Sequence, residues 1–354
     1  MTSPLLEISN LSVLFPSTSD EQAVPAIKNI SFSLNQGETL GIIGESGSGK
    51  SVTLLSLLGL INVDPGIVSG SIVLTKNKNK INLLENIEQY ISYENDSLTI
   101  NNLSKWKKQR ERLYKDIRGS EISMIFQNPK LAFNPFYSVG SQINEMIRLH
   151  TDTKNKIDAK KVAIEWLTRV KMEAPAMRYN NNPYGLSGGM CQRAMIAMAL
   201  ASEPSILIAD EPTTGLDATI QSNIVDLLSS IKKDSNISMI VVSHDFNVMR
   251  ELTDRVIVYY KGRIIEEGLT KNIFNEKRDN IHPYTKRLLE ANLQGFTDSS
   301  SLPETNMTRH SGCDFYDMCP SKGENHLNRC MHETPVFFDV GDQHRIRCWR
   351  YQNA

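Results

Sequence analysis

The chain has 354 residues, of which 40% are hydrophobic and 22% charged, a composition typical of soluble globular proteins that excludes a mainly disordered chain. Lys and Arg number 39 and Asp and Glu number 40, so a formal net charge of −1 gives no global attraction to nucleic acid or anionic lipid. No apolar run reaches the ~18 residues of a membrane-spanning helix and the N-terminus lacks a secretory signal, so we expect a cytosolic globular protein.

The first part of the chain is predicted to be β-structure. Apolar and polar residues alternate over 5–15 and again over 27–34, as they do in half-buried strands. The short apolar run 38–43 is typical of a buried central strand. A glycine-rich loop at 44–51 follows, and it leads into the apolar, helix-compatible stretch 52–60.

The middle of the chain changes character. Residues 76–118 are polar and charged with little core-forming pattern, and we interpret them as a surface insertion with at least one solvated helix near 104–115. The basic residues of this helix indicate a solvated face more readily than a functional basic patch. Helical periodicity extends over 141–172, and 177–185 interrupts it before another helical pattern at 188–201.

Two later runs, 206–209 and 238–242, have the composition of buried strands. Strands that alternate with helices predict an α/β fold with a mostly parallel sheet that is covered on both faces. Residues 295–312 are rich in Ser, Thr and Pro and almost free of large aliphatic residues, which indicates a linker. The chain shows no internal repeat.

The sharpest local motif begins at Gly44 and ends in Gly49-Lys50-Ser51, and it fits the pattern G-x-x-x-x-G-K-[ST]. Only a loop without bulky Cβ groups lets successive backbone N–H groups converge on phosphate oxygens, and the following helix adds its positive N-terminal dipole. Lys50 would reach the β- and γ-phosphates, and the Ser51 hydroxyl would bind Mg²⁺. The alternative, a Gly/Ser turn without a ligand, is disfavoured by the preceding strand and the following helix. The predicted nucleotide-binding residues of this loop are Gly44, Glu45, Ser46, Gly47, Ser48, Gly49, Lys50, Ser51 and Val52.

Two acidic residues, Asp210 and Glu211, follow the aliphatic run 206–209. A carboxylate at the carboxyl end of a buried strand, beside a phosphate loop, lies where a second contact to Mg²⁺ is needed. We therefore expect Asp210 to bind Mg²⁺, directly or through water, and Glu211 to polarise the attacking water. For this pair taken alone, an acidic helix N-cap is the alternative.

A third motif, Leu186-Ser187-Gly188-Gly189-Met190, resembles the signature loop of ATP-binding cassette (ABC) proteins. In physical terms it is another glycine-containing anion site at the start of a helix, with the Ser187 hydroxyl as an extra donor. It lies between the phosphate loop and Asp210-Glu211, with Gln127 upstream and His244 downstream, and that full order is very specific. The chain is identified as a member of the ABC-transporter ATPases, with one phosphate loop and one signature.

The resemblance implies roles for further residues. Gln127 matches the glutamine that touches Mg²⁺ or water and reports to the membrane partner. His244 matches the histidine that contacts the γ-phosphate, which makes Glu211 and His244 the catalytic residues. Asp217 matches the loop that crosses the dimer interface. Phe15 lies where the family places an aromatic ring against adenine, and a core position is its alternative.

Within the family, the chain most resembles the ATPase subunits of oligopeptide and dipeptide permeases over nearly its whole length. The segments that carry this likeness are 125–129, 134–135, Met190 after Ser-Gly-Gly, 209–214, 282–284 and 344–349. Asn128, in place of the usual Asp, and the long segment 76–118 depart from the family pattern. The resemblance implies a P-loop ABC ATPase domain over 1–270, with an antiparallel β subdomain and a helical subdomain at about 128–186. It also implies a small C-terminal, cysteine-containing extension over 271–354.

The resemblance also implies partners, a cofactor and a location. A second, homologous ATPase subunit, typically a different chain, would meet this one head to tail, so that the signature of one closes over ATP and Mg²⁺ on the other. Two separate transmembrane permease subunits would contact the segment 127–140, and an extracytoplasmic solute-binding protein would take part indirectly. The chain would lie peripherally on the cytoplasmic face of a bacterial cell membrane and support uptake of peptides or of a related solute such as nickel or heme. No nucleic acid is expected.

Two other classes of function remain open. A soluble ABC ATPase that acts on ribosomes or DNA usually carries two cassettes, coiled-coil arms or a basic surface, and none is evident in the sequence. An inactive, ATP-sensing regulator is difficult to reconcile with the presence of both Glu211 and His244.

The chain has five cysteines, a number that favours reduced thiols or a metal site over disulfides, and four of them lie near the C-terminus: Cys313, Cys319, Cys330 and Cys348. They form no C-x-x-C pair, so a zinc ribbon fits poorly. Four thiolates suit a 4Fe–4S cluster or a tetrahedral zinc ion, and similar tails in the resembled subfamily point to iron–sulfur. Four free thiols in a reducing cytosol are the alternative. Cys191 belongs to the signature helix and is excluded from this set.

Overall fold

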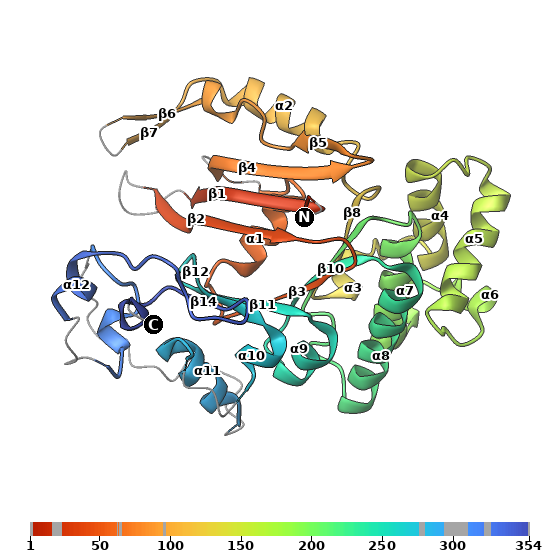
Figure 1. Cartoon of the computed structure of the whole chain (residues 1–354). Helices are drawn as coiled ribbons and strands as arrows, with labels where there is room; N and C mark the ends of the chain where they lie inside the picture. The colour runs from red at the N-terminus through yellow and green to blue at the C-terminus, as the bar shows by residue number, and fades with distance from the viewer. Residues whose placement is uncertain are drawn as a thin grey trace.

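A computed structural model describes residues 3–15, 23–61, 63, 66–94, 97–275, 280–293, 311–321 and 327–352. Within these residues the strands form a large mixed sheet, a smaller antiparallel sheet and one hairpin (Figure 1). The large sheet has the order β13-β14-β12-β11-β3-β10-β9-β8, and the antiparallel sheet has the order β2-β1-β4-β5. Helices α4, α5 and α6 lie at one end of the molecule, and α12 and the C-terminus lie at the other (Figure 1).

Five neighbouring strands of the large sheet, from β11 at its centre to β8 at one edge, are parallel and almost completely buried. These strands are β3 (Thr39–Ile43), β8 (Ile122–Ile125), β9 (Ile206–Asp210), β10 (Ser238–Val242) and β11 (Arg255–Tyr260). All residues of β3, β8, β10 and β11 are buried, as expected of parallel strands that are covered on both faces. The strands predicted at 38–43, 206–209 and 238–242 are therefore confirmed to within one residue.

The smaller sheet is antiparallel and comprises β1 (Leu6–Phe15), β2 (Val24–Leu34), β4 (Gly66–Lys76) and β5 (Asn79–Asn82). The alternation that predicted β1 and β2 corresponds to one buried face, which contributes Leu6, Ile8, Ile27 and Leu34 to the core. Strand β2 begins three residues before the start that the alternation indicates.

The segment 76–118 is more structured than its composition indicates. After β5 come η1 (Ile87–Gln89), β6 (Ile91–Glu94), β7 (Ser97–Ile100) and α2 (Leu103–Tyr114). Helix α2 is solvated on one face only, because Trp106, Arg110 and Tyr114 are buried on the other. The Tyr114 hydroxyl donates to the Ser56 carbonyl at 2.9 Å, and Arg110 donates to the Ile61 carbonyl at 2.7 Å. Two large aromatic rings thus anchor a helix whose other side chains are mostly polar.

The helical part consists of α3 (Pro129–Ala132), α4 (Val139–His150), α5 (Lys156–Arg169), α6 (Pro175–Arg178) and η2 (Pro183–Gly185). The periodicity over 141–172 is therefore divided between two helices. The second helix starts at a polar cap, where the Asn155 side chain accepts a hydrogen bond from the Ile157 N–H. The apolar spacing continues on both sides of this break, so periodicity alone does not reveal it.

Further helices cover the large sheet and precede the C-terminal segment. They are α1 (Lys50–Leu57), α7 (Gly188–Leu200), α8 (Ala218–Ser235), α9 (Phe246–Leu252), α10 (Thr270–Ile273) and α11 (Pro283–Leu293). In the described residues no helix has the length and apolar character needed to cross a membrane.

The C-terminal segment joins the large sheet instead of forming a body of its own. It contains η4 (Tyr316–Met318), α12 (Leu327–His332), β13 (Phe338–Asp339), β14 (Arg345–Ile346) and η5 (Trp349–Tyr351). Strand β14 pairs antiparallel with β12 (Arg263–Leu269), and the fully buried Glu266 and His344 form a hydrogen-bonded pair at 2.7 Å. Of the predicted linker 295–312, residues 295–310 lie outside the described residues.

Candidate functional site

The glycine-rich loop lies between β3 and α1, and its glycines have backbone geometry that other residues rarely adopt. The φ angles are +149° at Gly44, +75° at Gly47 and +106° at Gly49, and Gly49 is the N-cap of α1. A Cβ atom on Gly44 would lie 2.4 Å from the Tyr259 carbonyl oxygen, and one on Gly49 would lie 2.8 Å from the Ala26 carbonyl oxygen. Side chains are therefore excluded from both positions, as a loop that cradles phosphates requires.

Lys50 is folded over this loop. Its Nζ donates hydrogen bonds of 2.8 Å to the carbonyl oxygens of Gly44 and Glu45. Burial lowers the pKa of Lys50, and the negative charges of Glu211, Asp210 and Glu45 oppose the fall. An amine that is partly removed from water and surrounded by acceptors is well suited to exchange these contacts for phosphate oxygens.

The two predicted metal ligands at the ends of α1 and β9 lie in contact. The Ser51 hydroxyl donates a hydrogen bond to Asp210, whose pKa is raised by burial and lowered again in part by this bond. A hydroxyl and a partly buried carboxylate side by side supply the oxygen ligands that Mg²⁺ prefers. The residues present therefore fit a bound Mg²⁺.

Glu211 is the centre of a hydrogen-bond cluster at the carboxyl ends of β8, β9 and β10. The Gln127 amide donates to its carboxylate at 2.7 Å, and the Thr214 hydroxyl donates at 2.9 Å. His244 Nδ1 lies 3.5 Å from the other carboxylate oxygen. The hydrogen bond from His244, which outweighs the effect of burial, lowers the pKa of Glu211 to about 2. Glu211 is thus ionised at neutral pH, and Gln127 is bound to it.

The contact with Glu211 raises the pKa of His244 above the ordinary value, against the opposing effect of burial. The stabilisation from this pair is fully present below the unfolded pKa of histidine and is lost as the pH rises through the higher folded value. We expect Glu211→Gln to lower the pKa of His244, because the carboxylate charge is gone. Titration of the His244 ring by NMR in both proteins measures this. An equal or higher pKa in the variant would show that Glu211 does not hold the imidazolium.

A cavity of about 1120 Å³ brings together most of the residues that are predicted to bind ATP and Mg²⁺ or to take part in hydrolysis on this chain. The lining includes these of them: Phe15, Gly44, Glu45, Ser46, Gly47, Gly49, Lys50, Ser51, Val52, Gln127, Glu211 and His244. Ser48 and Asp210 are not part of the lining. The Ser48 hydroxyl is buried, and among the described residues no hydrogen-bond partner faces it. Phe15 is half-buried at the end of β1, so it both touches the core and lines the cavity.

Sequence reasoning missed one wall of this cavity. Leu288, Ala291 and Asn292 of α11 line it, although α11 is far from the phosphate loop along the chain. Lys261 and Gly262, in the turn between β11 and β12, line it as well. The segment 282–284 carries part of the family resemblance, but no local pattern connects it with a phosphate loop. The remaining lining residues without a prior prediction are Val24, Pro25, Ala26, Lys28, Ser243 and Phe246.

The signature segment does not line the cavity of its own chain. Ser187 is exposed and caps α7, where its side chain accepts a hydrogen bond from the Met190 N–H. A Cβ atom on Gly189 would lie 2.7 Å from a methyl carbon of Ile220, so this glycine allows α7 to pack closely against α8. Asp217 caps α8 in the same way and is also exposed.

The four C-terminal cysteines gather in one region without forming a ligand group. All four are free thiols. The Cys313 N–H donates to the Cys330 carbonyl at 2.8 Å. Burial first, and then the charges of the neighbouring thiolates, raise the pKa of Cys313 to about 12 and that of Cys348 to about 11. Across the described part of the chain, no three His, Cys, Asp or Glu side chains are arranged to hold a metal ion. Four thiols are the donor type that suits a cluster, but in the described residues they are not arranged as a set of metal ligands.

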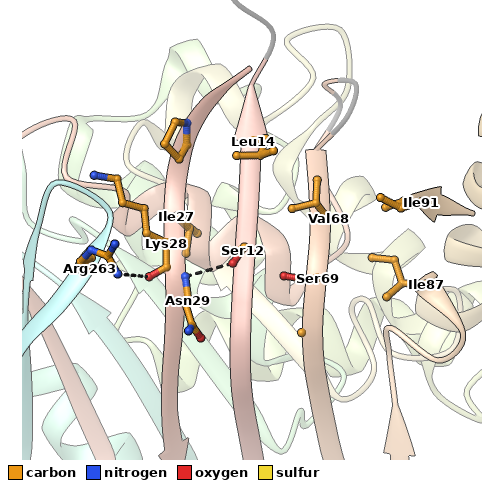
Figure 2. A pocket seen from close by; sticks show the side chains of 12 residues that line it. Ser12, Leu14, Ile27, Lys28, Asn29, Val68, Ser69, Ile87, Ile91 and Arg263 are labelled. Carbon is orange, nitrogen blue, oxygen red and sulfur yellow. Dashed lines mark hydrogen bonds between the residues drawn. The ribbon is translucent and has the colours of Figure 1, made fainter. Parts of the chain in front are cut away.

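A second hollow lies on the antiparallel sheet and contains none of the predicted site residues. This groove of about 590 Å³ runs across β2, β1 and β4, and its lining includes Leu14, Ile27, Val68 and Ile91 (Figure 2). Lys28 and Arg263 lie next to each other at one side of it (Figure 2). Both cations are bound to Asp314 of the C-terminal segment, at 3.1 and 2.9 Å.

Comparison with known proteins places this arrangement in a family. A family model described as "ABC transporter" matches residues 27–214. A protein of Brucella abortus (strain 2308) with the name "Putative peptide import ATP-binding protein" is 36% identical over 363 aligned positions, which cover 99% of this chain and 98% of that protein. A second protein of that strain and description is 39% identical over 325 positions, which cover 90% and 88% of the two chains.

Solved structures are also similar. A dimeric bacterial ABC transporter cassette, MJ0796, aligns with a TM-score of 0.58 and 25% identity over 75% of this chain and 98% of that chain. The protein cbiO1 from Clostridium perfringens, described as part of the ABC transporter complex cbiONQ, aligns with a TM-score of 0.56 and 25% identity over 83% and 96% of the two chains. The fold is therefore that of a P-loop ABC ATPase, which binds ATP with Mg²⁺. From the family match and the full-length relatives, the chain belongs to the ABC transporter family and is one of its ATPases.

Proposed function

We propose that this chain is the ATPase subunit of a bacterial importer for peptides or a related solute, and that it lies peripherally on the cytoplasmic face of the membrane. The observation that carries the proposal is the likeness to peptide import ATP-binding proteins over 90–99% of the chain. The relative that aligns over 99% of this chain also covers the C-terminal segment, so the likeness is not limited to the cassette that all ABC proteins share.

At the site, we propose that the loop of Gly44–Val52 binds the phosphates and that Phe15 contacts adenine. Ser51 and Asp210 would hold Mg²⁺, which neutralises charge on the phosphates when bound. Gln127 would also bind Mg²⁺, once its hydrogen bond to Glu211 is broken. Glu211 would then be free to accept a proton from the attacking water, and His244 would contact the γ-phosphate.

We further propose that two ATPase subunits, typically this chain and a homologous one, meet head to tail. Leu186, Ser187, Gly188, Gly189 and Met190 of one subunit would close over ATP in the cavity of the other. Ser187 and Asp217 are exposed and lie outside the cavity of their own chain, so both side chains are available to a partner subunit. Removal of the γ-phosphate would then open the dimer.

The segment 127–140 is proposed as the contact with two transmembrane permease subunits. It presents large apolar side chains to solvent, with exposed fractions of 76% for Leu131, 87% for Phe136 and 60% for Tyr137. Exposed apolar patches of this kind mark interaction sites. A solute-binding protein outside the membrane would act on these subunits and not on this chain.

Purification of the chain from its own cells should bring down two polytopic membrane proteins, and Phe136→Asp should remove most of them, because the new charge would be buried in the contact. Val336→Asp is the matched control, since Val336 is 54% exposed on the C-terminal segment. Label-free mass spectrometry of the purified material measures both. Ribosomal proteins or DNA in place of membrane proteins would support a soluble ABC ATPase and contradict the importer.

We also propose that Cys313, Cys319, Cys330 and Cys348 hold a 4Fe–4S cluster. The proposal is supported by the closeness of the four cysteines, which is such that a thiolate at one raises the pKa of Cys313 or Cys348, and by the suitability of four thiolates for such a cluster. The segment has a small core of its own, formed around Ile346, Cys348 and Tyr351, so ligation would add folding free energy where little is available.

Chain prepared without oxygen should be brown, with about four iron and four acid-labile sulfide per chain. Cys319→Ser should bleach it and make the segment sensitive to protease, whereas the matched change Cys191→Ser, in α7, should leave the colour unchanged. One zinc per colourless chain would retain the site with another metal. Absence of any metal, with anaerobic handling verified, would leave four ordinary thiols.

A further inference from the structure

The N-terminal part of α11 is attached to the phosphate loop by a tyrosine. The Tyr284 hydroxyl accepts a hydrogen bond of 3.0 Å from the backbone N–H of Glu45, the second residue of the loop. Tyr284 is 2% exposed, and burial raises its pKa, so the phenol remains protonated. Arg287, one turn further along α11, lies within electrostatic range of the Glu45 carboxylate. Helix α11, which precedes the C-terminal segment, thus contacts the loop directly.

Glu45 is held from two sides. Its N–H is bound by Tyr284, and its carbonyl oxygen accepts a hydrogen bond of 2.8 Å from Lys50 Nζ. When Lys50 turns to a phosphate, it gives up that carbonyl. The Glu45 carbonyl then keeps a backbone hydrogen bond from the Ser48 N–H at 3.2 Å, and the Tyr284 hydroxyl remains as the side-chain contact, among the described residues, to the Glu45 backbone. A loop kept in one geometry loses less conformational freedom when the nucleotide binds.

The ring of Tyr284 is itself held by the C-terminal segment, residues 311–321 and 327–352, which carries four cysteines and is called the cysteine-bearing segment. It packs against Phe315 with ring centroids 5.6 Å apart in an edge-to-face arrangement, and against Tyr260 at 4.6 Å. Phe315 is 3% exposed, and its backbone N–H donates a hydrogen bond to the Cys313 sulfur. Asp314, between these two residues, is clamped by Lys28 and Arg263, which Figure 2 shows side by side. A continuous set of contacts therefore leads from Cys313 through Phe315 and Tyr284 to Glu45.

We propose that Tyr284 is a positioning residue of the ATP site: its hydroxyl fixes the backbone of Glu45, and its ring is fixed by Phe315, so that the docked cysteine-bearing segment sets the affinity for ATP. The inference rests on the proposed function in one respect, namely that the loop Gly44–Val52 binds the phosphates. Tyr284 does not line the cavity, so it would act through the loop and not by contact with the nucleotide.

The test uses full-length chain and three variants. Tyr284→Phe removes the hydroxyl and keeps the ring, and Phe315→Leu removes the ring that supports it. Tyr260→Phe is the matched control, because the Tyr260 hydroxyl donates a hydrogen bond to the Met318 sulfur at 3.9 Å and, among the described residues, makes no hydrogen bond to the loop. Dissociation constants for Mg-ATP are measured by calorimetry. KM and kcat are measured in the assembled complex, and thermal unfolding is measured without nucleotide.

Tyr284→Phe should raise both the dissociation constant and KM by roughly three- to tenfold, the size of effect that the loss of one hydrogen bond produces. The kcat value should stay within about twofold of the wild type. Phe315→Leu should also raise the dissociation constant, although Phe315 does not line the cavity. Tyr260→Phe should leave the dissociation constant unchanged. A lower unfolding temperature with unchanged affinity in Tyr284→Phe would make the tyrosine purely structural and overturn the inference.

Lys50→Ala distinguishes a wrong role for Tyr284 from a wrong assignment of the ATP site. Loss of ATP binding in Lys50→Ala together with normal binding in Tyr284→Phe would contradict the role of Tyr284 and leave the ATP site intact. Normal binding in Lys50→Ala would instead contradict the assignment of the loop itself.

Discussion

Glu211→Gln should slow ATP turnover by about 10²- to 10⁴-fold, the range that general-base assistance contributes. The carboxamide keeps the shape of the side chain and can still contact Thr214 and His244, but it no longer accepts a proton from water. In the present structure Glu211 is ionised and bound by Gln127, so the same carboxylate is ready once that amide turns away. Phosphate release from the assembled complex at saturating ATP measures the loss.

ATP binding should survive this change. Mg-ATP at a hundred times its dissociation constant should stabilise Glu211→Gln against unfolding by about 2.7 kcal/mol, as it does the wild type. Glu203→Gln is the matched control, since Glu203 is an exposed residue in the turn before β9 and should not affect the rate. Unchanged hydrolysis in Glu211→Gln would remove Glu211 from the role of base.

Ser187→Arg should leave ATP binding by the isolated chain unchanged and should reduce hydrolysis at the partner's site by roughly 10²-fold or more. Ser187 is exposed and does not line the cavity of its own chain, so an arginine at this position should not contact the nucleotide bound to the same chain. In a head-to-tail dimer, the bulky cation would occupy the place where the opposing triphosphate has to dock.

Calorimetry on the isolated chain and single-turnover hydrolysis in the complex separate these two effects. Ser235→Arg is the matched control, because Ser235 is exposed at the far end of α8. If Ser187→Arg blocks ATP binding to the lone chain, the head-to-tail arrangement is wrong. If it leaves hydrolysis in the complex unchanged, the signature does not complete the partner's site.

The sequence alone was sufficient for the parts of the fold that depend on local pattern. The central strands β3, β9 and β10 are nearly continuous apolar runs, because a parallel strand that is buried on both faces needs apolar side chains at successive positions. The phosphate loop was predictable because its glycines are needed for backbone angles and close approaches that only glycine allows. Helix α2 shows the limit of composition, since two buried rings determine where it docks.

The chemistry of the site depended on contacts that no local pattern encodes. Gln127, Glu211 and His244 come from three strands far apart in the sequence, and they meet because parallel strands end at the same edge of the sheet. The hydrogen bond from Gln127 to Glu211 is known from the 2.7 Å distance in the structure, and the two residue types alone do not predict it. The same holds for Tyr284. Its residue type was visible in the sequence, but its place beside Glu45 arises from the packing of α11 against the loop, which is a long-range contact.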